Sequence, residues 1–339
     1  MASTSVEELI AAAVATAEAE AIAPHERADM LVEIAMGLQQ RPKNSEQLEG
    51  AVALYERAIA LCVPDDYVTV ARIRARMGTA LQAIPSEGYA DLERARACYE
   101  HASNVLRVAG EAPELAEIDL NLGLVLQTLA GIGRAKITDA IAAYQRALLT
   151  FDKVAFPQEY AILQNNLAAA FLSIPFSDER SKLREALAVQ SFEEGLRVVT
   201  MIDHPVEYAM LQNNLGNALQ YSSTSHRIEN TLRALDAYDE ALKVRTRSAA
   251  PLEYANTISN RANALANLPD DLEDRGAGNR ANLARAVEGY AEARELFAAH
   301  GEYEKVRLVT AAIDEIAVEL ESTLAISALF ARTHEDTLS

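Results

Sequence analysis

A short block of sequence recurs through the middle of the chain at a nearly constant interval. Residues 205–209 read Pro-Val-Glu-Tyr-Ala, and residues 213–219 read Asn-Asn-Leu-Gly-Asn-Ala-Leu. Related text lies one unit upstream and one unit downstream, so that Tyr160, Tyr208 and Tyr254 are separated by 48 and 46 residues. A period in this range is typical of repeat arrays. The sequence therefore predicts stacked copies of one structural unit.

Each unit has the pattern of two helices. In the unit that begins at Pro205, the second half carries Ala234, Tyr238 and Ala241, a spacing of four and then three that places all three on one helical face. Prolines stand at or just before the start of each first helix, where a missing N–H costs little. We expect six helical hairpins within residues 24–300. Their second helices should bury one aromatic residue each: Tyr55, Tyr99, Tyr144, Phe192, Tyr238 and Tyr290.

The pairing of Leu215-Gly216 with the later Ala234, Tyr238 and Ala241 resembles the tetratricopeptide repeat. That repeat has about 34 residues, so these units resemble its longer, bacterial-type variants. They depart from it by alanine in place of the helix-packing glycine at positions 35, 168 and 262, and by Arg261 in place of leucine. The resemblance implies an all-α solenoid. It also implies a right-handed superhelix whose first helices line a concave, ligand-binding groove.

The two ends of the chain do not follow the repeat. Residues 1–23 are expected to form an N-terminal capping helix, because a solenoid must cover its first exposed face. Residues 301–332 are expected to form a capping or association helix, and residues 333–339 a frayed tail. Four apolar residues follow the last repeat, and they can either cap it or join two chains as a homodimer, which the sequence slightly favours. These residues are Leu324, Ile326, Leu329 and Phe330.

Charge and hydropathy restrict the partners. A net charge of −19 repels phosphate backbones, so nucleic acid and anionic membranes are not expected as partners. There is no apolar run of 18 residues and no signal-peptide pattern at residue 1, so we expect a cytoplasmic protein. Cys62 and Cys98 lie in apolar segments with a helical pattern, and they are expected to be core residues rather than a disulfide.

Catalytic and metal-binding motifs are weak. Residues 131–136 are rich in glycine and basic residues, but no strand precedes them, so a turn between helices is the better interpretation. The histidines fall in different units, and the acidic residues at 270–274 lack the alternating ligands of a calcium loop. We expect no metal, no cofactor and no enzymatic activity.

Asparagine is frequent in the first helices although it is a poor helix former. One stripe, which comprises Asn121, Asn166, Asn214 and Asn260, recurs at the same place in successive units and suggests a structural role. A second stripe falls on the face that the resemblance assigns to the groove, where contact with a ligand and simple solvation are equally open. Its members are Asn165, Asn213, Asn217, Gln220, Asn256, Ser259 and Asn263.

The leading hypothesis is a non-enzymatic scaffold or adaptor that binds a peptide or a partner protein in this groove. Amide side chains both donate and accept hydrogen bonds, so they can hold an extended main chain without charge. One alternative is a sensor or carrier of a small polar ligand held between the hairpins of units four to six. Another is an accessory or assembly factor for a partner enzyme. An enzyme with an α/α-toroid fold is disfavoured, because the in-phase repeats indicate an open stack.

Overall fold

The computed structural model describes residues 6–17, 22–85, 88–174, 180–222, 226–274 and 278–336, and it describes the side chains of the last helix as far as Glu321. Fourteen helices and no strand occur within these ranges. The predicted all-α fold class is therefore confirmed. The chain divides into two compact units, Met1–Ile174 and Pro175–Ser339, which are described separately.

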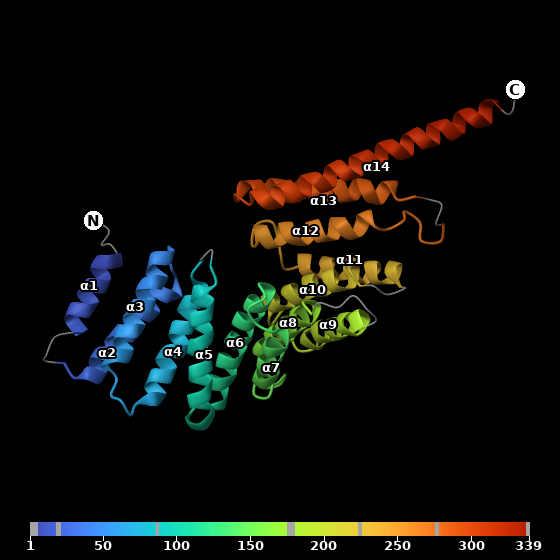
Figure 1. Cartoon of the computed structure of the whole chain (residues 1–339). Helices are drawn as coiled ribbons and strands as arrows, with labels where there is room; N and C mark the ends of the chain where they lie inside the picture. Colours follow the sequence, from blue (N-terminus) through green and yellow to red (C-terminus); the bar gives the residue numbers. More distant parts are fainter. Residues whose placement is uncertain are drawn as a thin grey trace. The chain divides into compact units, whose positions relative to one another are not determined.

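Unit 1 is a stack of helical hairpins (Figure 1). Within it, α2 packs on α3, α4 on α5 and α6 on α7, and each hairpin packs on the next. The first helix packs on both α2 and α3, where the sequence predicts a cap. The helices are α1 (Val6–Ala17), α2 (Pro24–Gln40), α3 (Ser45–Leu61), α4 (Tyr67–Ala83), α5 (Ala90–Ala109), α6 (Ala112–Gly131), α7 (Ile137–Ala147) and α8 (Pro157–Leu172).

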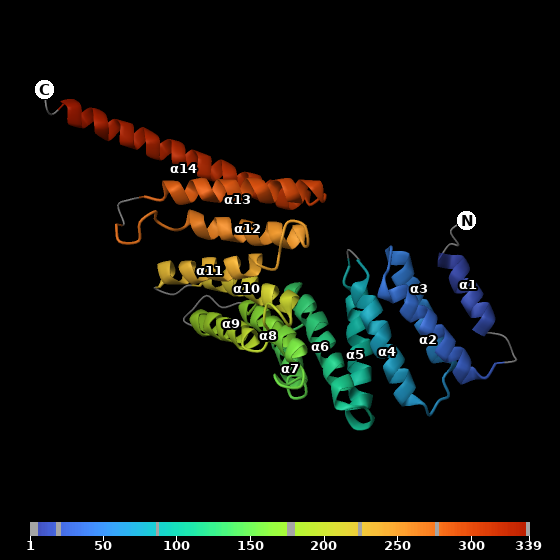
Figure 2. The same cartoon turned by 180° about the vertical axis from the view of Figure 1, so that it is seen from behind.

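Unit 2 continues the pattern, with α10 packed on α11 and α12 packed on α13 (Figure 2). The last helix lies along α13 and then extends past it. Leu324, Ile326, Leu329 and Phe330 lie in the C-terminal part of α14, and their side chains lie outside the described ones. The helices are α9 (Arg180–Leu196), α10 (Pro205–Gln220), α11 (Arg227–Leu242), α12 (Pro251–Ala266), α13 (Arg280–Ala299) and α14 (Tyr303–Asp336).

The boundary between the units falls inside the fourth predicted hairpin, after α8 and before α9. Each unit taken alone is a stack of α-solenoid type, in which hairpins contact their neighbours along the chain. The right-handed superhelix over the whole chain stays a prediction. None of the helices, over the residues described, combines the length and the apolar character needed to cross a membrane.

The local sequence explains where the helices begin. Pro24, Pro157, Pro205 and Pro251 each open a first helix, where proline loses no intrahelical hydrogen bond. The second hairpin begins instead with a side-chain cap, in which Asp66 accepts a hydrogen bond of 3.1 Å from the backbone N–H of residue 69. First helices thus begin either at a proline or after a residue whose side chain caps the helix.

The six aromatic residues of the second helices are buried, as predicted. The glycine that follows the apolar residue of the first helix, as in Met77-Gly78 and Leu215-Gly216, lies against the tyrosine ring of the second helix. A Cβ at Gly216 would stand 2.6 Å from the ring of Tyr238, and one at Gly78 would stand 3.0 Å from the ring of Tyr99. The glycine therefore lets the two helices of a hairpin approach until the ring fills the space between them.

The buried tyrosines also share a hydrogen-bond acceptor. In four hairpins the tyrosine hydroxyl donates to a glutamine of the first helix that stands four residues after the glycine or alanine of the pair. Such a bond satisfies a hydroxyl that burial removes from water. We call these contacts the tyrosine–glutamine pairs: Tyr55–Gln39 at 2.9 Å, Tyr99–Gln82 at 3.3 Å, Tyr144–Gln127 at 2.8 Å and Tyr238–Gln220 at 2.9 Å.

Candidate functional site

The predicted site residues of α10 are engaged in hydrogen bonds within unit 2. Asn217 accepts a bond of 2.7 Å from the hydroxyl of Tyr238, which also bonds Gln220. Asn213 is buried and accepts a bond of 3.3 Å from Asn260 of α12. Asn217 and Gln220 thus bond the core tyrosine of the fifth hairpin, and Asn213 links the first helices α10 and α12.

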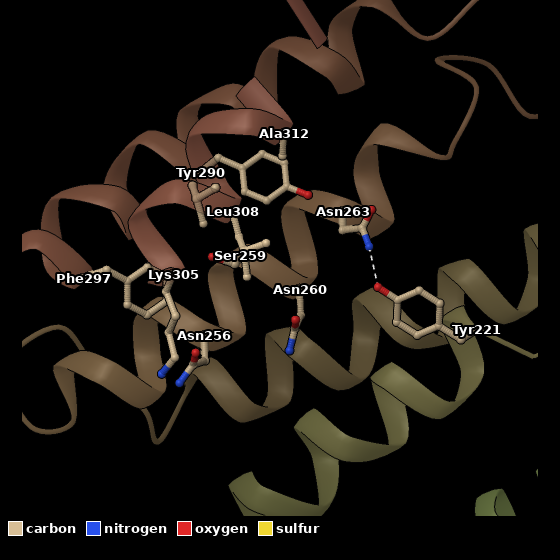
Figure 3. Close-up of a pocket in the computed structure, with 11 residues that line it drawn as sticks. Tyr221, Asn256, Ser259, Asn260, Asn263, Tyr290, Phe297, Lys305, Leu308 and Ala312 are labelled. Carbon is tan, nitrogen blue, oxygen red and sulfur yellow. Dashed lines mark hydrogen bonds between the residues drawn. The ribbon is translucent and has the colours of Figure 1, made fainter. Parts of the chain in front are cut away.

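The predicted residues of α12 have different surroundings. Asn256, Ser259 and Asn263 line an open cavity of about 570 Å³ that is bordered by α12, α13 and α14 and reaches Tyr221 after α10 (Figure 3). The structure thus brings three of the seven predicted residues to one cavity. The other lining residues are Tyr221, Asn260, Tyr290, Phe297, Lys305, Leu308, Val309 and Ala312.

One side of the cavity is polar and uncharged. Asn263 donates a hydrogen bond of 2.7 Å to the hydroxyl of Tyr221. The hydroxyl oxygen of Ser259 is buried, and within the described part of the chain it has no hydrogen-bond partner. The side chain of Asn256 is partly exposed, and no hydrogen bond is described for it. Buried polar groups in proteins are normally paired, so the hydroxyl of Ser259 indicates a place where a ligand can bond.

The opposite side is apolar. It consists of Phe297 of α13 and of Leu308, Val309 and Ala312 of α14. Lys305 is the one charged residue of the lining; it forms an ion pair of 3.2 Å with Glu302, and its ammonium lies 5.3 Å from the centroid of the Phe297 ring. The cavity therefore offers neutral hydrogen-bonding groups opposite an apolar wall.

Tyr290 connects the cavity with the core of the sixth hairpin. Its side chain is 7% exposed, and burial raises its pKa to about 12, so the hydroxyl keeps its proton at neutral pH. In the position where four other hairpins carry the glutamine of a tyrosine–glutamine pair, the sixth has Ala266. The hydroxyl has no described hydrogen-bond partner in the protein, and in Figure 3 it points toward Asn263.

Asn165, the remaining predicted site residue, belongs to unit 1. There its amide donates a hydrogen bond of 3.2 Å to Asn166, just as Asn213 donates one of 3.0 Å to Asn214 in unit 2. Adjacent asparagines of the two stripes are thus bonded to each other in both units. The predicted continuous patch from Asn165 to Asn263 stays a prediction, and the cavity is described within unit 2 alone.

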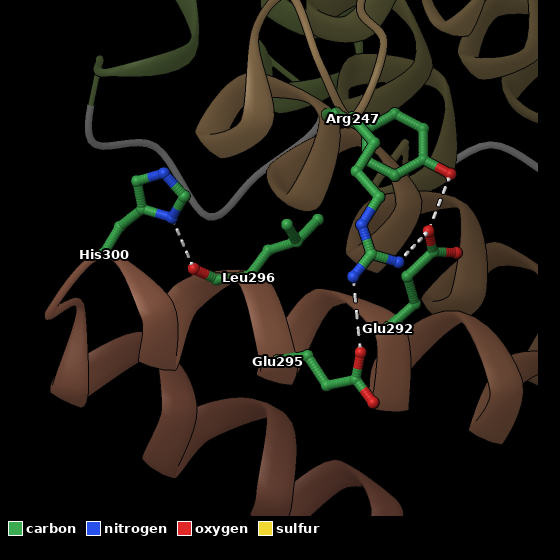
Figure 4. Close-up of polar contacts among 6 residues, drawn as sticks. Arg247, Glu292, Glu295, Leu296 and His300 are labelled. Carbon is green, nitrogen blue, oxygen red and sulfur yellow. Dashed lines mark hydrogen bonds and ion pairs between the residues drawn. The ribbon is translucent and has the colours of Figure 1, made fainter.

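A second polar cluster of unit 2 fixes the turn before α12 to α13 (Figure 4). Arg247 forms ion pairs of 3.4 Å with Glu292 and 3.5 Å with Glu295. The hydroxyl of Tyr254, the tyrosine of the repeated Pro-x-Glu-Tyr-Ala block, donates to Glu292 at 3.2 Å. Ion pairs this exposed contribute little stability each, and the cluster contains no group without a partner. We assign it a structural role.

Two motifs considered in the sequence serve as helix ends. Gly133 has φ of +73°, the left-handed conformation that follows the end of a helix, here α6. The guanidinium of Arg134 lies 3.4 Å from the centroid of the Tyr89 ring, so it stacks on an aromatic face. Asp270 accepts hydrogen bonds from two backbone N–H groups at the start of α13, and these bonds lower the pKa of its carboxyl.

Among the residues whose positions the structure gives, no three histidine, cysteine or acidic side chains are grouped so that they could hold a metal ion. Burial raises the pKa of the thiols of Cys62 and Cys98, which makes both weaker nucleophiles at neutral pH. The cavity between α12 and α14 therefore remains the best candidate for a functional site.

Comparison with known proteins gives no family. No family model matches the chain, and no curated protein matches it. The crystal structure of BtubC (BKLC) from P. vanneervenii is similar over 94% of this chain and 93% of its own length, with 19% identity and a TM-score of 0.39. The crystal structure of the apo form of RapI is similar over 94% of this chain and 98% of its own, with 12% identity and a TM-score of 0.44. The assignment of the fold rests on the helices themselves.

Sequence reasoning missed part of the lining. The helical spacing assigned Tyr290 to the core, which agrees with its burial, and residues 301–332 were expected only to form a capping or association helix. The spacing could not show that the same residues also border a cavity. One signal was present in the sequence. The sixth hairpin keeps its tyrosine, but Ala266 stands where four other hairpins with a tyrosine have glutamine.

Proposed function

We propose that the protein is a tetratricopeptide-like scaffold that binds an extended segment of a partner protein in the cavity between α12, α13 and α14. The observation that carries this proposal is the set of neutral polar groups without partners opposite an apolar wall. The repeat pattern and the packing of successive hairpins support the family resemblance.

The spacing of the asparagines favours a peptide. Asn256, Asn260 and Asn263 follow one face of α12, and seven residues of helix at 1.5 Å each span about 10 Å. An extended peptide advances about 3.3 Å per residue, so this face matches roughly three residues of a bound segment. Amide groups can pair with both the N–H and the C=O of a main chain.

Charge narrows the choice of segment. The lining offers no unpaired charge for an acidic group, since the ammonium of Lys305 already contacts Glu302. The chain as a whole carries −19, which disfavours the approach of acidic partners. We therefore infer an uncharged or basic segment with at least one large apolar side chain.

Peptide display with the full chain tests the proposal. Random peptides of about twelve residues would be selected on the unmodified protein and then measured against the Asn256→Ala, Asn263→Ala double variant. We expect at least tenfold weaker binding, because several hydrogen bonds worth about 1 kcal/mol each are lost. The matched control is Asn104→Ala on the exposed surface of α5. Equal binding by the double variant would contradict the proposal.

Two narrower alternatives depend on the same cavity. Its volume also falls in the range of small-molecule pockets, so a carrier of a small polar ligand would show thermal stabilisation by metabolites and none by the selected peptides. An accessory factor for a partner enzyme would bind that enzyme through the same segment. Self-association through Leu324, Ile326, Leu329 and Phe330 is a separate proposal, and light scattering on the full chain and on one ending at Ser322 tests it.

We propose that this binding involves no catalysis. The raised pKa values of the two thiols and the neutral lining of the cavity support this, because neither supplies an activated nucleophile or an acid–base pair.

A further inference from the structure

The sixth hairpin alters the tyrosine–glutamine pair at one partner only. In the fourth hairpin both members are replaced together, by Phe192 and Leu172, so neither a hydroxyl nor an acceptor remains. In the sixth hairpin Tyr290 keeps the hydroxyl while Ala266 lacks the acceptor. The hydroxyl of Tyr290 therefore lacks the internal acceptor that four other tyrosines use, whereas Phe192 of the fourth hairpin shows that the position can also be filled without a hydroxyl.

The hydroxyl of Tyr290 lies where a ligand could accept a hydrogen bond from it. Its ring belongs to the lining of the cavity, and its hydroxyl points toward Asn263 rather than into the stack (Figure 3). The buried hydroxyl oxygen of Ser259 and the side chain of Asn256 face the same cavity without described partners. The missing glutamine thus coincides, within the described part of unit 2, with a tyrosine hydroxyl that borders a cavity lined by Ser259 and Asn256.

We propose that the hydroxyl of Tyr290 donates a hydrogen bond to an uncharged carbonyl of the bound segment, whose adjacent large apolar side chain contacts Phe297, Leu308 and Val309. This inference rests on the proposed function and names the group that the cavity recognises. Tyr290 is then a specificity-determining residue, because a ligand without a carbonyl at this place leaves its hydroxyl buried and unpaired.

The lining argues for a carbonyl rather than an anion. A carboxylate or phosphate at the hydroxyl would need a cation nearby, and the ammonium of Lys305 is paired with Glu302 at 3.2 Å. A neutral carbonyl needs only a donor, which the protonated phenol supplies. The apolar side chains of Phe297, Leu308 and Val309 offer no hydrogen bond that would compete with it.

A blocked amino acid provides the probe. N-acetyl-leucine N-methylamide carries two carbonyls, no charge and one large apolar side chain. It would be titrated into the full chain while amide chemical shifts are recorded by NMR. We expect saturable shifts that are confined to residues of α12, α13 and the first turns of α14.

Two variants test the role of the hydroxyl. Ala266→Gln restores the acceptor in the position that Gln220 holds in the fifth hairpin, so the hydroxyl of Tyr290 should turn to it, and probe binding should weaken roughly five- to tenfold. Tyr290→Phe removes the hydroxyl and keeps the ring, and the same weakening is expected without a new side chain in the cavity. The control is Gln127→Ala, which breaks the tyrosine–glutamine pair of Tyr144 in unit 1 and should leave probe binding unchanged.

The outcomes separate this inference from the proposed function. Loss of binding in both variants supports the inference. Undiminished binding in Tyr290→Phe, or no saturable shifts with the unmodified chain, overturns it. If peptides from the display experiment still bind and depend on Asn256 and Asn263, the proposed function stands although this inference fails. If no peptide depends on those residues, the proposed function fails as well.

Discussion

The fifth and sixth hairpins are neighbours in unit 2 and carry a tyrosine at the same position, but the two tyrosines have different surroundings. In the fifth, Gly216 lets the ring of Tyr238 approach closely, and the hydroxyl is bonded by Asn217 and Gln220. In the sixth, Ala262 of α12 takes the place of the glycine. The methyl group of Ala262 packs against Gly289 of α13, where an added Cβ would lie 3.3 Å from the Cβ of Ala262.

The difference shows how a repeat can acquire a site without losing its fold. Moving the small residue from one helix to the other keeps the two helices of the sixth hairpin close. Replacing the glutamine by Ala266 then frees the polar end of Tyr290 without disturbing the packing of its ring.

The largest effect is expected from removing the rings. Tyr238→Ala should lower the free energy of unfolding by about 3–5 kcal/mol, because the ring is completely buried and leaves a cavity. Tyr290→Ala should cost less, since its ring already borders open space. Chemical denaturation of both variants measures the difference. Equal losses would mean that the two hairpins pack their tyrosines alike.

A methyl group at the glycine should have the next largest effect. Gly216→Ala places a Cβ 2.6 Å from the Tyr238 ring, and overpacking of this kind costs about 1–3 kcal/mol. The reverse change, Ala262→Gly, should cost about 1 kcal/mol through helix propensity alone. Thermal melts of the pair give the comparison, and a stabilised Gly216→Ala variant would refute the close approach.

Alkaline pH should destabilise both hairpins. Burial raises the pKa of Tyr290 to about 12 and that of Tyr238 further, above the ordinary value of 10. Above pH 10 the unfolded chain releases these phenolic protons while the folded chain retains them, so stability is complete below pH 10 and falls as the pH rises. Each buried tyrosine contributes about 1.4 kcal/mol per pH unit in this range. Denaturation at pH 9 to 11 tests the sign, and a flat profile would contradict it.

The smallest effect concerns the hydroxyls alone. Tyr238→Phe should cost about 0.5–1.5 kcal/mol, because it removes the donor to Asn217 and Gln220. Tyr290→Phe should change stability by less than about 0.5 kcal/mol, since no described protein group accepts its bond. A cost for Tyr290→Phe equal to that for Tyr238→Phe would show that its hydroxyl has a structural partner.

The fold followed from the sequence because the repeat fixes its own register. The spacing of Ala234, Tyr238 and Ala241 identifies the buried face, and the prolines mark the starts of first helices. The division after Ile174 was not predicted, since the text on either side of it keeps the same pattern.

The candidate site followed only in part. Composition identified the amides of α12, but it could not separate Asn217, which bonds a core tyrosine, from Asn263, which lines a cavity. Both are asparagines on first helices, and the distinction depends on which helix packs opposite them. The contribution of α14 is a tertiary contact between segments that share no motif, so no local pattern could reveal it.

The cavity also has a mechanical consequence for the end of the chain. Helix α14 packs along α13 and supplies Leu308, Val309 and Ala312 to the cavity, opposite the amides of α12. A ligand that contacts both sides holds α14 against α12, because ligand binding and the packing of α14 then stabilise each other. At a ligand concentration about one hundred times the Kd, local release of α14 should become roughly a hundredfold rarer. Hydrogen exchange in the first turns of α14 should then slow with ligand, whereas exchange in α7 should not change.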